Sequence, residues 1–388
     1  MLELILWGAI GILGYIYFGY PLLIILLGRV FRQRDAHSRE PAPEAAPAAA
    51  LPSITVIITA YNEAKHIAEK IRNIFALDYP HDRLDIIVAS DASSDATDEI
   101  VRQCTSEKVR LLRVEGRQGK TACQNAAANA ASGDVLVFTD ATTTLGSDAL
   151  QAIALRFRDP EVGCVAGRLT YISRQDDATG KGGTSYWGYE TALRVAESSL
   201  GSLIGVSGCL YGVRRSAYRD IRPDLISDFV IAMVMREQDL RTVLEPAATC
   251  TEETLDRADR ELAMRIRVTL RSLVALATQR RFLNPLRFGT FAWQLWSHKL
   301  LRYLSPVFWL CALAANIALA SRGEYVLLLA LQVLALSAGL LGFLQLPVLG
   351  KSRLLAQPYY FVLTNVASAI SLVKFIRREK VVTWTPLR

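Results

Sequence analysis

Short apolar segments alternate with helical patterns between Pro52 and about Cys250. Segments rich in β-branched residues, with the length of buried strands, occur at residues 54–59, 85–89, 109–114 and 134–138. The stretches between them have helical patterns, at residues 64–77, 95–104 and 119–131. Because strands alternate with helices, we predict an α/β domain over residues 52–250, with a mostly parallel sheet and helices on both faces.

A long apolar stretch precedes this domain. Leu4–Leu27 is uncharged, and at about 1.5 Å per helical residue it is long enough to cross a hydrocarbon core of about 30 Å. Arg29, Arg32 and Arg34 follow it, which predicts a cytoplasmic C-terminal end by the positive-inside rule. A cleaved signal peptide is the alternative, but the run is too long and Glu3 replaces the basic residues expected there. We therefore predict a retained anchor at residues 1–28.

Residues 303–376 form a second apolar region, followed by a basic tail at 377–388. The stretches 303–320 and 326–349 are long enough to span a membrane, whereas 357–375 suits a third span or a re-entrant or interfacial segment equally well. We favour two spans. They return the chain to the cytoplasm and leave the basic residues that follow on that side: Lys351, Arg353, Arg377, Arg378 and Lys380.

The connecting segments differ in composition. Residues 29–51 are basic and then rich in Pro and Ala, which predicts a linker. Residues 174–185 are polar and Gly-rich and predict a loop near the site. Residues 251–302 predict basic amphipathic helices at the membrane interface, with Arg267 and Arg271 on one stripe. The apolar stripe comprises Leu262, Ile266, Leu270, Leu273 and Ala277.

Charge is concentrated in one of these segments. The chain has a formal net charge of +7, and residues 255–302 contain ten Lys or Arg against three Asp or Glu, an excess of seven. No recognised nucleic-acid-binding motif accompanies this excess, so an anionic membrane surface or a diphosphate group is the favoured partner. The six cysteines lack the spacing of a zinc site or a disulfide framework.

Acidic residues follow the ends of successive predicted strands. Glu63, Asp91 and Asp140 come after the first, second and fourth strands. Ligands of open α/β sheets bind at the carboxyl ends of the strands, so acids gathered there indicate a nucleotide and a cation. An oxidoreductase of the Rossmann type is disfavoured because no G-x-G-x-x-G follows the first strand.

An ordered set of motifs resembles the family 2 glycosyltransferases, and more closely their membrane-embedded branch of cellulose, hyaluronan and chitin-oligosaccharide synthases. The motifs are Ala60-Tyr61-Asn62-Glu63, Ser90-Asp91, Gly119-Lys120, Thr139-Asp140, Ser207-Gly208-Cys209 and Ser227-Asp228. The resemblance implies a GT-A fold, a nucleotide-diphosphate-sugar donor with a UDP-sugar favoured, Mg²⁺ or Mn²⁺, and inversion at the anomeric carbon. It also implies a saccharide or lipid-linked acceptor, membrane lipids and export or envelope-assembly proteins as partners, and an inner-membrane location with a cytoplasmic catalytic domain.

The resemblance assigns a role to each matching residue. Asp228 is the expected general base, and Asp140 with Thr142 is the expected metal site. The donor site is expected to include Ala60, Tyr61, Glu63, Asp91, Lys120, Asp140, Arg267 and Arg271, and the acceptor site Ser207, Gly208, Cys209 and Trp187. Structural alternatives exist: an Asx-turn or helix cap for Asp91, a purely structural role for Asp140, and a helix N-cap for Asp228. Asp95 is interpreted as a helix cap only.

Two departures bear on activity. Family members commonly place a second acid two residues after the first in the metal motif, where this chain has Thr142, and processive synthases carry Gln-x-x-Arg-Trp where only Arg271 remains. Both favour an alternative, a catalytically weakened membrane-tethered module that binds nucleotide sugars in an export system. The presence of Asp91, Asp140 and Asp228 together favours the enzyme.

Overall fold

The structure is a computed structural model that describes residues 1–36, 51–104, 108–172, 178–253, 258–343 and 353–379. The chain forms two compact units. The sheet unit comprises Leu27–Ile172 and Arg194–Glu252, and the helical unit comprises Met1–Leu26, Ser173–Leu193 and Glu253–Lys380.

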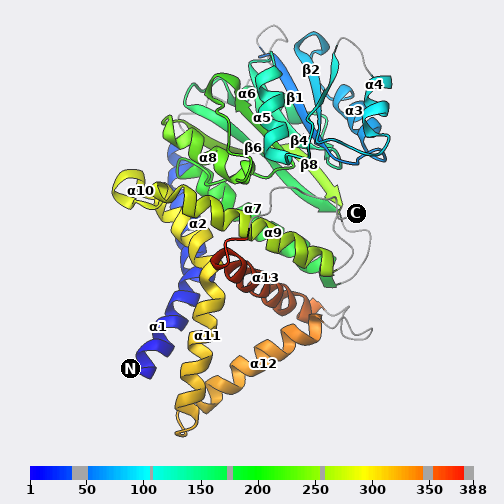
Figure 1. Cartoon of the computed structure of the whole chain (residues 1–388). Coiled ribbons are helices and arrows are strands. Elements are labelled where there is room, and N and C mark those ends of the chain that lie inside the picture. Colours follow the sequence, from blue (N-terminus) through cyan, green and yellow to red (C-terminus); the bar gives the residue numbers. More distant parts are fainter. Residues whose placement is uncertain (37–50, 105–107, 173–177, 254–257, 344–352, 380–388) are drawn as a thin grey trace. The chain divides into compact units, whose positions relative to one another are not determined.

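An eight-stranded sheet with the order β3-β2-β1-β4-β7-β6-β8-β5 forms the centre of the sheet unit (Figure 1). β1 (Ile54–Ala60) pairs in parallel with β2 (Leu84–Ser90) and β4 (Val135–Asp140), and β2 pairs in parallel with β3 (Val109–Arg113). β7 (Leu210–Arg214) is antiparallel to β4 and to β6 (Val162–Ile172), and β5 (Thr144–Leu145) is antiparallel to β8 (Arg241–Glu253). The predicted α/β sheet is confirmed, with parallel pairing in the half that contains β1 to β4.

Helices cover both faces of this parallel half, because the chain reverses direction across the sheet after β3. Right-handed crossovers place α3 (Ile67–Phe75) and α4 (Thr97–Gln103) on one face and α5 (Lys120–Ala130) on the other. Every residue of β1 is buried, as expected for a strand covered on both faces. On one face, Ile54, Val56 and Ile58 pack in a core with side chains of α3 and of α6 (Ala149–Arg156).

Two further helices follow strands of the sheet. α8 (Ser227–Glu237) follows β7, and α7 (Ala178–Ser199) follows β6. α7 corrects one prediction, since residues 178–185 of the predicted loop are helical, and residues 174–177 of that loop lie outside the described residues. Glycine-rich sequence lowers helix propensity, but propensity is a weak guide that the surrounding structure overrides.

The N-terminal apolar stretch is helical throughout. α1 (Leu2–Gly14), a π-helical turn (Tyr15–Gly19) and α2 (Tyr20–Ala36) follow one another without a break. The predicted linker is therefore wrong from residue 29 to Ala36, because arginine is a good helix former and the basic residues extend the helix. Residues 37–50 of that linker lie outside the described residues.

The described part of the chain after β8 consists of helices joined by turns. Its elements are α9 (Ala258–Thr278), α10 (Pro285–Gln294), a π-helical turn (Leu295–Leu300), α11 (Leu301–Ala320), α12 (Val326–Phe343) and α13 (Arg353–Ile376). Short 3₁₀ turns occur at His81–Arg83, Arg215–Ala217 and Arg280–Leu283. Among the described residues, three helices are long and apolar enough to cross a membrane, at Leu2–Phe31, Pro285–Ala320 and Tyr359–Ile376, and Val326–Gly339 is a shorter apolar helix.

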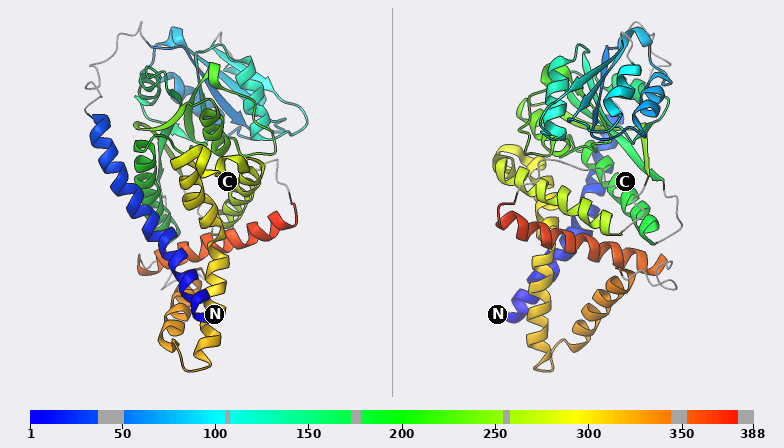
Figure 2. Two further views of the ribbon diagram at one scale, coloured as in Figure 1. Left: turned by 90° about the vertical axis from the view of Figure 1, so that its left-hand side faces the viewer. Right: turned by 45° about the vertical axis from the view of Figure 1, so that its right-hand side comes forward.

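Within the helical unit, α1 packs along α11, whereas α13 crosses α11 and runs beside α9 (Figures 1 and 2). Ser371 Oγ donates to the carbonyl of Ile266 at 3.1 Å, and Tyr360 Oη donates to Glu261 at 3.0 Å. Of the predicted apolar stripe on α9, Leu270 and Leu273 are buried, whereas Ala277 is exposed. α13 thus packs on the amphipathic helix α9, and whether residues 357–375 span the membrane or lie at its interface stays a prediction.

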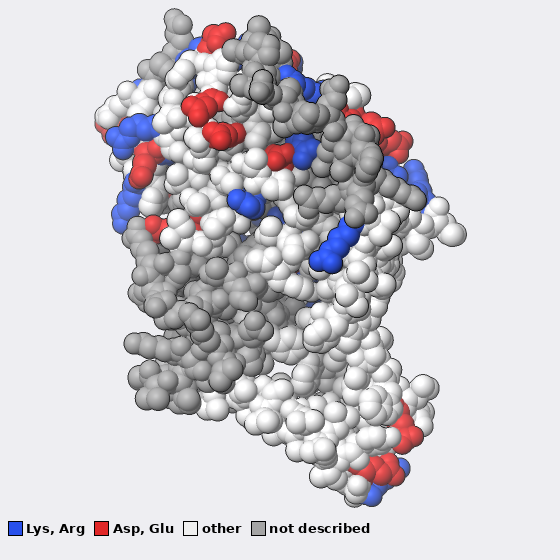
Figure 3. Space-filling view, turned by 180° about the vertical axis from the view of Figure 1, so that it is seen from behind, with Lys and Arg blue, Asp and Glu red and all other residues white. Residues whose placement is uncertain are grey.

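Apolar side chains face outward on the helices with membrane-spanning character. Phe18, Leu310 and Leu334 are 78%, 64% and 65% exposed. Figure 3 shows few charged atoms on this part of the surface until its far end, whereas Lys, Arg, Asp and Glu side chains are scattered over the sheet unit. An uncharged surface of this kind is suited to contact with lipid.

Candidate functional site

The strand order creates a natural binding place at one end of the sheet. β1 and β4 are neighbours, but the chain leaves β1 toward β2 and enters β4 from β3 on the far side. Ligands of open α/β sheets bind at such a reversal, outside the carboxyl ends of the strands. Ala60 and Asp140 are the last residues of β1 and β4, so the predicted site residues at these strand ends do come together.

Lys120 and Asp140 form an ion pair at this end of the sheet. Lys120 is the first residue of α5, and its Nζ lies 2.5 Å from Asp140 Oδ1, with side chains 22% and 29% exposed. Burial acts to lower the pKa of Lys120, but the charge of Asp140 and the hydrogen bond to it outweigh this effect, so the pKa is raised. The Asp228 carboxylate adds to that increase. The ammonium group is therefore a permanent positive charge where the predicted donor diphosphate would bind.

Asp228 reaches the same place from α8. The helix begins at Ser227 after Ile226, so Asp228 lies within the first turn and the predicted N-cap alternative is wrong. The first turn favours a carboxylate because unpaired N–H groups and the helix dipole are positive there. The Val206 N–H donates to the Asp228 carbonyl at 2.8 Å, which attaches the loop before β7 to the start of α8.

Gly208 lies close to both Asp228 and Lys120. A Cβ atom placed on Gly208 would lie 3.0 Å from Asp228 Oδ2 and 3.1 Å from Lys120 Nζ. The predicted acceptor residues Ser207, Gly208 and Cys209 therefore lie beside the predicted base and the donor lysine. Four separate segments, the end of β4, the start of α5, the start of α8 and the 207–209 loop, meet at one point.

A further acid, Glu252, lies near Thr142, the position at which family members commonly have a second acid. β8 pairs with β5 so that Cys250 faces Leu145 and Thr251 faces Thr144, which brings Glu252 next to the β4–β5 loop. Thr142 Oγ1 donates to Glu252 Oε1 at 3.5 Å, and Cys209 Sγ donates to Glu252 Oε2 at 3.2 Å. Burial raises the pKa of the Cys209 thiol, and the charges of Glu252 and Asp140 raise it further, so this cysteine stays protonated.

The oxygen donors of this region fit a hard divalent cation. Among the described residues, no group of three or more His, Cys, Asp or Glu side chains is placed to hold a metal by itself. Mg²⁺ usually binds through one or two carboxylates together with substrate phosphates and water. Asp140, the Thr142 hydroxyl and the neighbouring Glu252 provide ligands of that type, so the residues suit a cation that binds together with a nucleotide diphosphate.

Asp91 positions the loop that leads into α5. Its carboxylate is fully buried and accepts hydrogen bonds from the N–H groups of Gln118 at 2.7 Å and Gly119 at 3.1 Å. Gly119 has φ of +92°, a conformation that favours glycine. Arg117 Nε lies 3.5 Å from the same carboxylate. The bonding is neither an Asx-turn nor a helix cap, and the predicted contact of Asp91 with the base or ribose stays a prediction.

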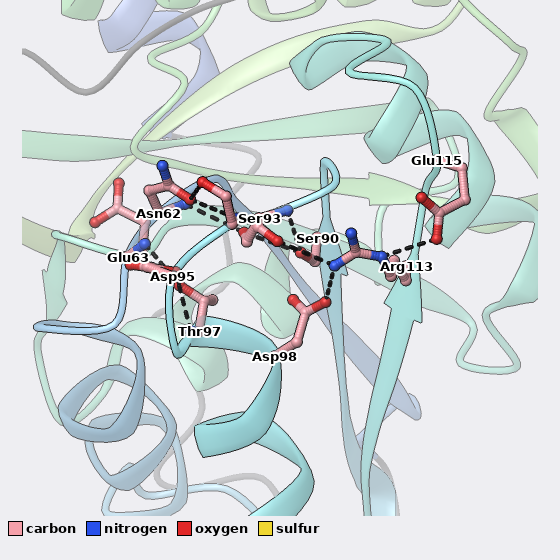
Figure 4. A network of polar contacts seen from close by, with 10 residues as sticks. Asn62, Glu63, Ser90, Ser93, Asp95, Thr97, Asp98, Arg113 and Glu115 are labelled. Carbon is pink, nitrogen blue, oxygen red and sulfur yellow. Dashed lines mark hydrogen bonds and ion pairs between the residues drawn. The ribbon is translucent and has the colours of Figure 1, made fainter.

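The loops after β1 and β2 interlock, as Figure 4 shows. The N–H groups of Asn62 and Glu63 donate to Ser93 Oγ at 3.2 Å and Thr97 Oγ1 at 2.8 Å. Asp95 accepts from the N–H of Ala64 at 3.2 Å and of Thr97 at 3.0 Å. Burial would raise the pKa of Asp95, but these bonds lower it. Asp95 is therefore structural, but it lies one residue before Ala96, the N-cap of α4, and not at the predicted cap position. The predicted donor residue Glu63 is held by this network.

Tyr61, the other predicted donor residue after β1, is covered by a guanidinium group. Arg117 Cζ lies 3.2 Å from the centroid of the Tyr61 ring, a distance within the range of cation–π contacts. Tyr61 and Arg117 thus lie together beside the buried carboxylate of Asp91. The sequence did not single out Arg117.

Three predicted site residues belong to the helical unit. Trp187 lies in α7, and Arg267 and Arg271 lie in α9. Arg271 is buried within its unit, with 8% of its surface exposed. Whether these residues join the site in the sheet unit stays a prediction.

Sequence reasoning also missed Lys70. It is 2% exposed on α3, and its Nζ donates to the Thr143 carbonyl at 2.6 Å and to Thr139 Oγ1 at 2.9 Å. Burial lowers its pKa to about 7, although Asp140, Cys250, Cys209 and Glu252 act in the opposite direction. A signal was present, since Lys70 interrupts the apolar stripe of Ile67, Ile71 and Ile74.

Comparison with known proteins agrees with this geometry. Residues 55–222 match the model of Glycosyl transferase family 2. The chain is 27% identical over 220 residues to a beta-monoglucosyldiacylglycerol synthase of Trichormus variabilis, which covers 56% of this chain and 45% of that protein. It is 27% identical over 207 residues to a poly-beta-1,6-N-acetyl-D-glucosamine synthase of Staphylococcus aureus, covering 52% of this chain and 50% of that protein. The chain thus spans about half the length of these two relatives.

A solved structure resembles nearly the whole chain. A mannosyltransferase from Pyrobaculum calidifontis, in complex with GDP-Man and Mn²⁺, superposes with a TM-score of 0.71 and 25% sequence identity. The alignment covers 98% of this chain and all of that one.

Proposed function

We propose that the chain is an inverting glycosyltransferase, because residues 55–222 match the model of Glycosyl transferase family 2 and nearly the whole chain resembles a solved mannosyltransferase structure. It transfers a sugar from a nucleotide-diphosphate sugar to a saccharide or lipid-linked acceptor. The observation that carries this proposal is the meeting of Lys120, Asp140, Asp228 and Gly208 at the reversal of strand order. A single displacement needs a positively charged side chain, an acidic residue that binds a metal and a second acidic residue that accepts a proton.

The reaction proceeds in one step. The Asp228 carboxylate accepts the proton of an acceptor hydroxyl while that oxygen forms a bond to C1 of the donor sugar. The bond from C1 to the diphosphate oxygen breaks on the opposite face, and its electron pair leaves with the nucleoside diphosphate. Lys120 stabilises the developing negative charge. Inversion follows because nucleophile and leaving group occupy opposite faces of the sugar ring.

A divalent cation fits this site through Asp140, with Thr142 and the neighbouring Glu252 as further oxygen donors. When bound, it supplies Lewis-acid stabilisation of the diphosphate. The metal requirement is supported by the Mn²⁺ in the related mannosyltransferase structure. This chain's own contribution is to hold Asp140 at the end of β4 and to place Lys120 against it at 2.5 Å.

We further propose that the reaction takes place at the cytoplasmic face of the inner membrane. The membrane-spanning character of Leu2–Phe31 and Pro285–Ala320 supports attachment. The basic residues after the first of these helices support a cytoplasmic sheet unit, where nucleotide sugars are made. The acceptor belongs to envelope or exopolysaccharide synthesis, a proposal supported by relatives named as glycolipid and polysaccharide synthases.

A donor panel tests the proposal. Purified full-length protein is incubated with Mn²⁺, membrane lipid extract and each of several UDP- and GDP-sugars, and release of nucleoside diphosphate is measured. We expect one donor to give release that depends on the extract and is lost in Asp228→Asn. If no donor gives more release than a control without protein, catalysis is excluded. Donor binding without release would favour the binding module.

A further inference from the structure

Lys70 lies in the buried core beneath the site, where a lysine side chain lowers the stability of the fold. Lys70 is on the buried stripe of α3 between Ile67, Ile71 and Ile74, and 2% of its surface is exposed. An amine removed from water is destabilising unless hydrogen bonds replace its hydration. A leucine or methionine in this position would pack without that cost, so the role of Lys70 must be sought in its bonds.

Two bonds from one amine enclose the loop that carries Asp140. Lys70 Nζ donates to Thr139 Oγ1 at 2.9 Å and to the Thr143 carbonyl at 2.6 Å. Thr139 precedes Asp140, and Thr143 follows Thr142, so the two bonded residues bracket the segment 140–142. The amine donates both bonds whether it is charged or neutral, because a neutral amine keeps two N–H groups.

The same amine reaches the acceptor side of the site through one relay. Thr139 Oγ1 accepts from Lys70 and donates to the Cys209 carbonyl at 2.8 Å. Cys209 follows Gly208, where an added Cβ would lie 3.0 Å from Asp228 Oδ2 and 3.1 Å from Lys120 Nζ. Thus Lys70, Thr139 and Cys209 form a continuous hydrogen-bonded chain from α3 to the loop beside the base.

We infer that Lys70 is a positioning residue: it holds the Asp140 loop directly and the Gly208 loop through Thr139. It is buried and hydrogen-bonded to protein groups, so it acts through these loops rather than on the substrate. The inference deepens the proposed function and rests on it. The two bonds of Lys70 have different consequences. The bond to the Thr143 carbonyl holds only the segment 140–142, whereas the Thr139 hydroxyl connects this segment to the Gly208 loop.

Binding of Mn²⁺ in the presence of UDP or GDP, followed by electron paramagnetic resonance, tests the first bond without turnover. Lys70→Met keeps the apolar stem and removes the donor. We expect metal affinity to fall about tenfold or more, as is typical when groups that orient a metal ligand are removed. Ile74→Ala is the matched control, because Ile74 is equally buried on the same helix but outside the hydrogen-bonded chain.

Substitutions at Thr139 test the relay. Thr139→Val removes the hydroxyl at constant shape, and Thr139→Ser keeps it. We expect Thr139→Val to lower turnover about tenfold while Mn²⁺ affinity changes less than it does in Lys70→Met, and we expect Thr139→Ser to retain most of the turnover. If Lys70→Met does not fold, the Thr139 pair decides alone.

The outcomes separate two failures. Metal affinity in Lys70→Met within about twofold of Ile74→Ala, or equal turnover in Thr139→Val and Thr139→Ser, would overturn the positioning role. If the wild-type protein does not bind Mn²⁺ in the presence of nucleotide and does not transfer sugar from any donor, the proposed function itself fails.

Discussion

Gly208→Ala is the substitution that most directly tests the geometry of the site. The added methyl carbon would lie 3.0 Å from Asp228 Oδ2 and 3.1 Å from Lys120 Nζ, whereas carbon contacts are favourable at about 3.5–4.0 Å. Both polar atoms must therefore move by a few tenths of an ångström. They are the ends of flexible side chains, so the fold accommodates the methyl group at little cost in stability.

We expect the methyl group to reduce turnover instead of stability. A misplacement of about 1 Å in an active site can reduce the rate about 10²-fold, so we expect a loss of about 10- to 100-fold in kcat. The assay compares nucleoside diphosphate release and thermal stability in wild type and Gly208→Ala. We expect Tm to change by less than a few degrees.

Gly205→Ala provides the control within the same loop. Its methyl carbon would meet the Phe229 ring at 3.1 Å rather than a charged group. We expect it to lower stability more than turnover, the reverse of Gly208→Ala. Turnover of Gly208→Ala within about threefold of wild type would refute the reasoning, because base and lysine would then not need their observed positions.

Four other results are expected. Asp228→Asn retains nucleotide binding but loses about 10²–10⁴ in rate; a rate within about threefold of wild type would show that Asp228 is not the base. Chelation removes activity and Mn²⁺ restores it in wild type, whereas Asp140→Ala stays inactive; full turnover in excess chelator contradicts the metal assignment. Without metal, we expect the stability of wild type relative to that of Lys70→Met to rise with pH above about 7, by up to about 1.4 kcal/mol per pH unit. The reason is that the lysine of the unfolded chain keeps its proton to higher pH than Lys70 does in the folded protein. A flat difference in Tm from pH 7 to 9 refutes this expectation. A reporter cysteine within residues 37–50 resists labelling from outside intact cells; labelling would overturn the topology.

The parallel half of the sheet was predictable because local pattern and burial agree there. β1 was expected at residues 54–59 and lies at Ile54–Ala60, and β2 was expected at 85–89 and lies at Leu84–Ser90. Continuous apolar runs of this length are typical of strands covered on both faces. The residues after such strands are then brought to one edge by topology, which is why Asp140 and the loops after β1 and β2 were placed correctly.

The helices were less predictable where composition and context disagree. α7 extends into a Gly-rich segment, and α2 extends through basic residues to Ala36. Neither extension has a strong local signal, since glycine weakens a helix and charge alone does not end one. For α13, apolar length fits a span, and its packing on the amphipathic helix α9 is compatible with an interfacial helix as well. Length alone does not separate these two arrangements.

The site residues that escaped the sequence are those whose role depends on distant pairing. Thr142 stands where related enzymes have a second acid, and spacing alone indicates a loss. In space, β8 brings Glu252 to the Thr142 hydroxyl from 110 residues away along the chain. A carboxylate near Asp140 is thus present without the local Asp-x-Asp spacing, so the substitution at Thr142 is a weaker argument against catalysis than the sequence implied. Because Lys120 already neutralises part of the charge of Asp140, we expect the metal to bind more tightly when a nucleotide diphosphate supplies further oxygen ligands, so metal affinity measured with nucleotide is the informative quantity.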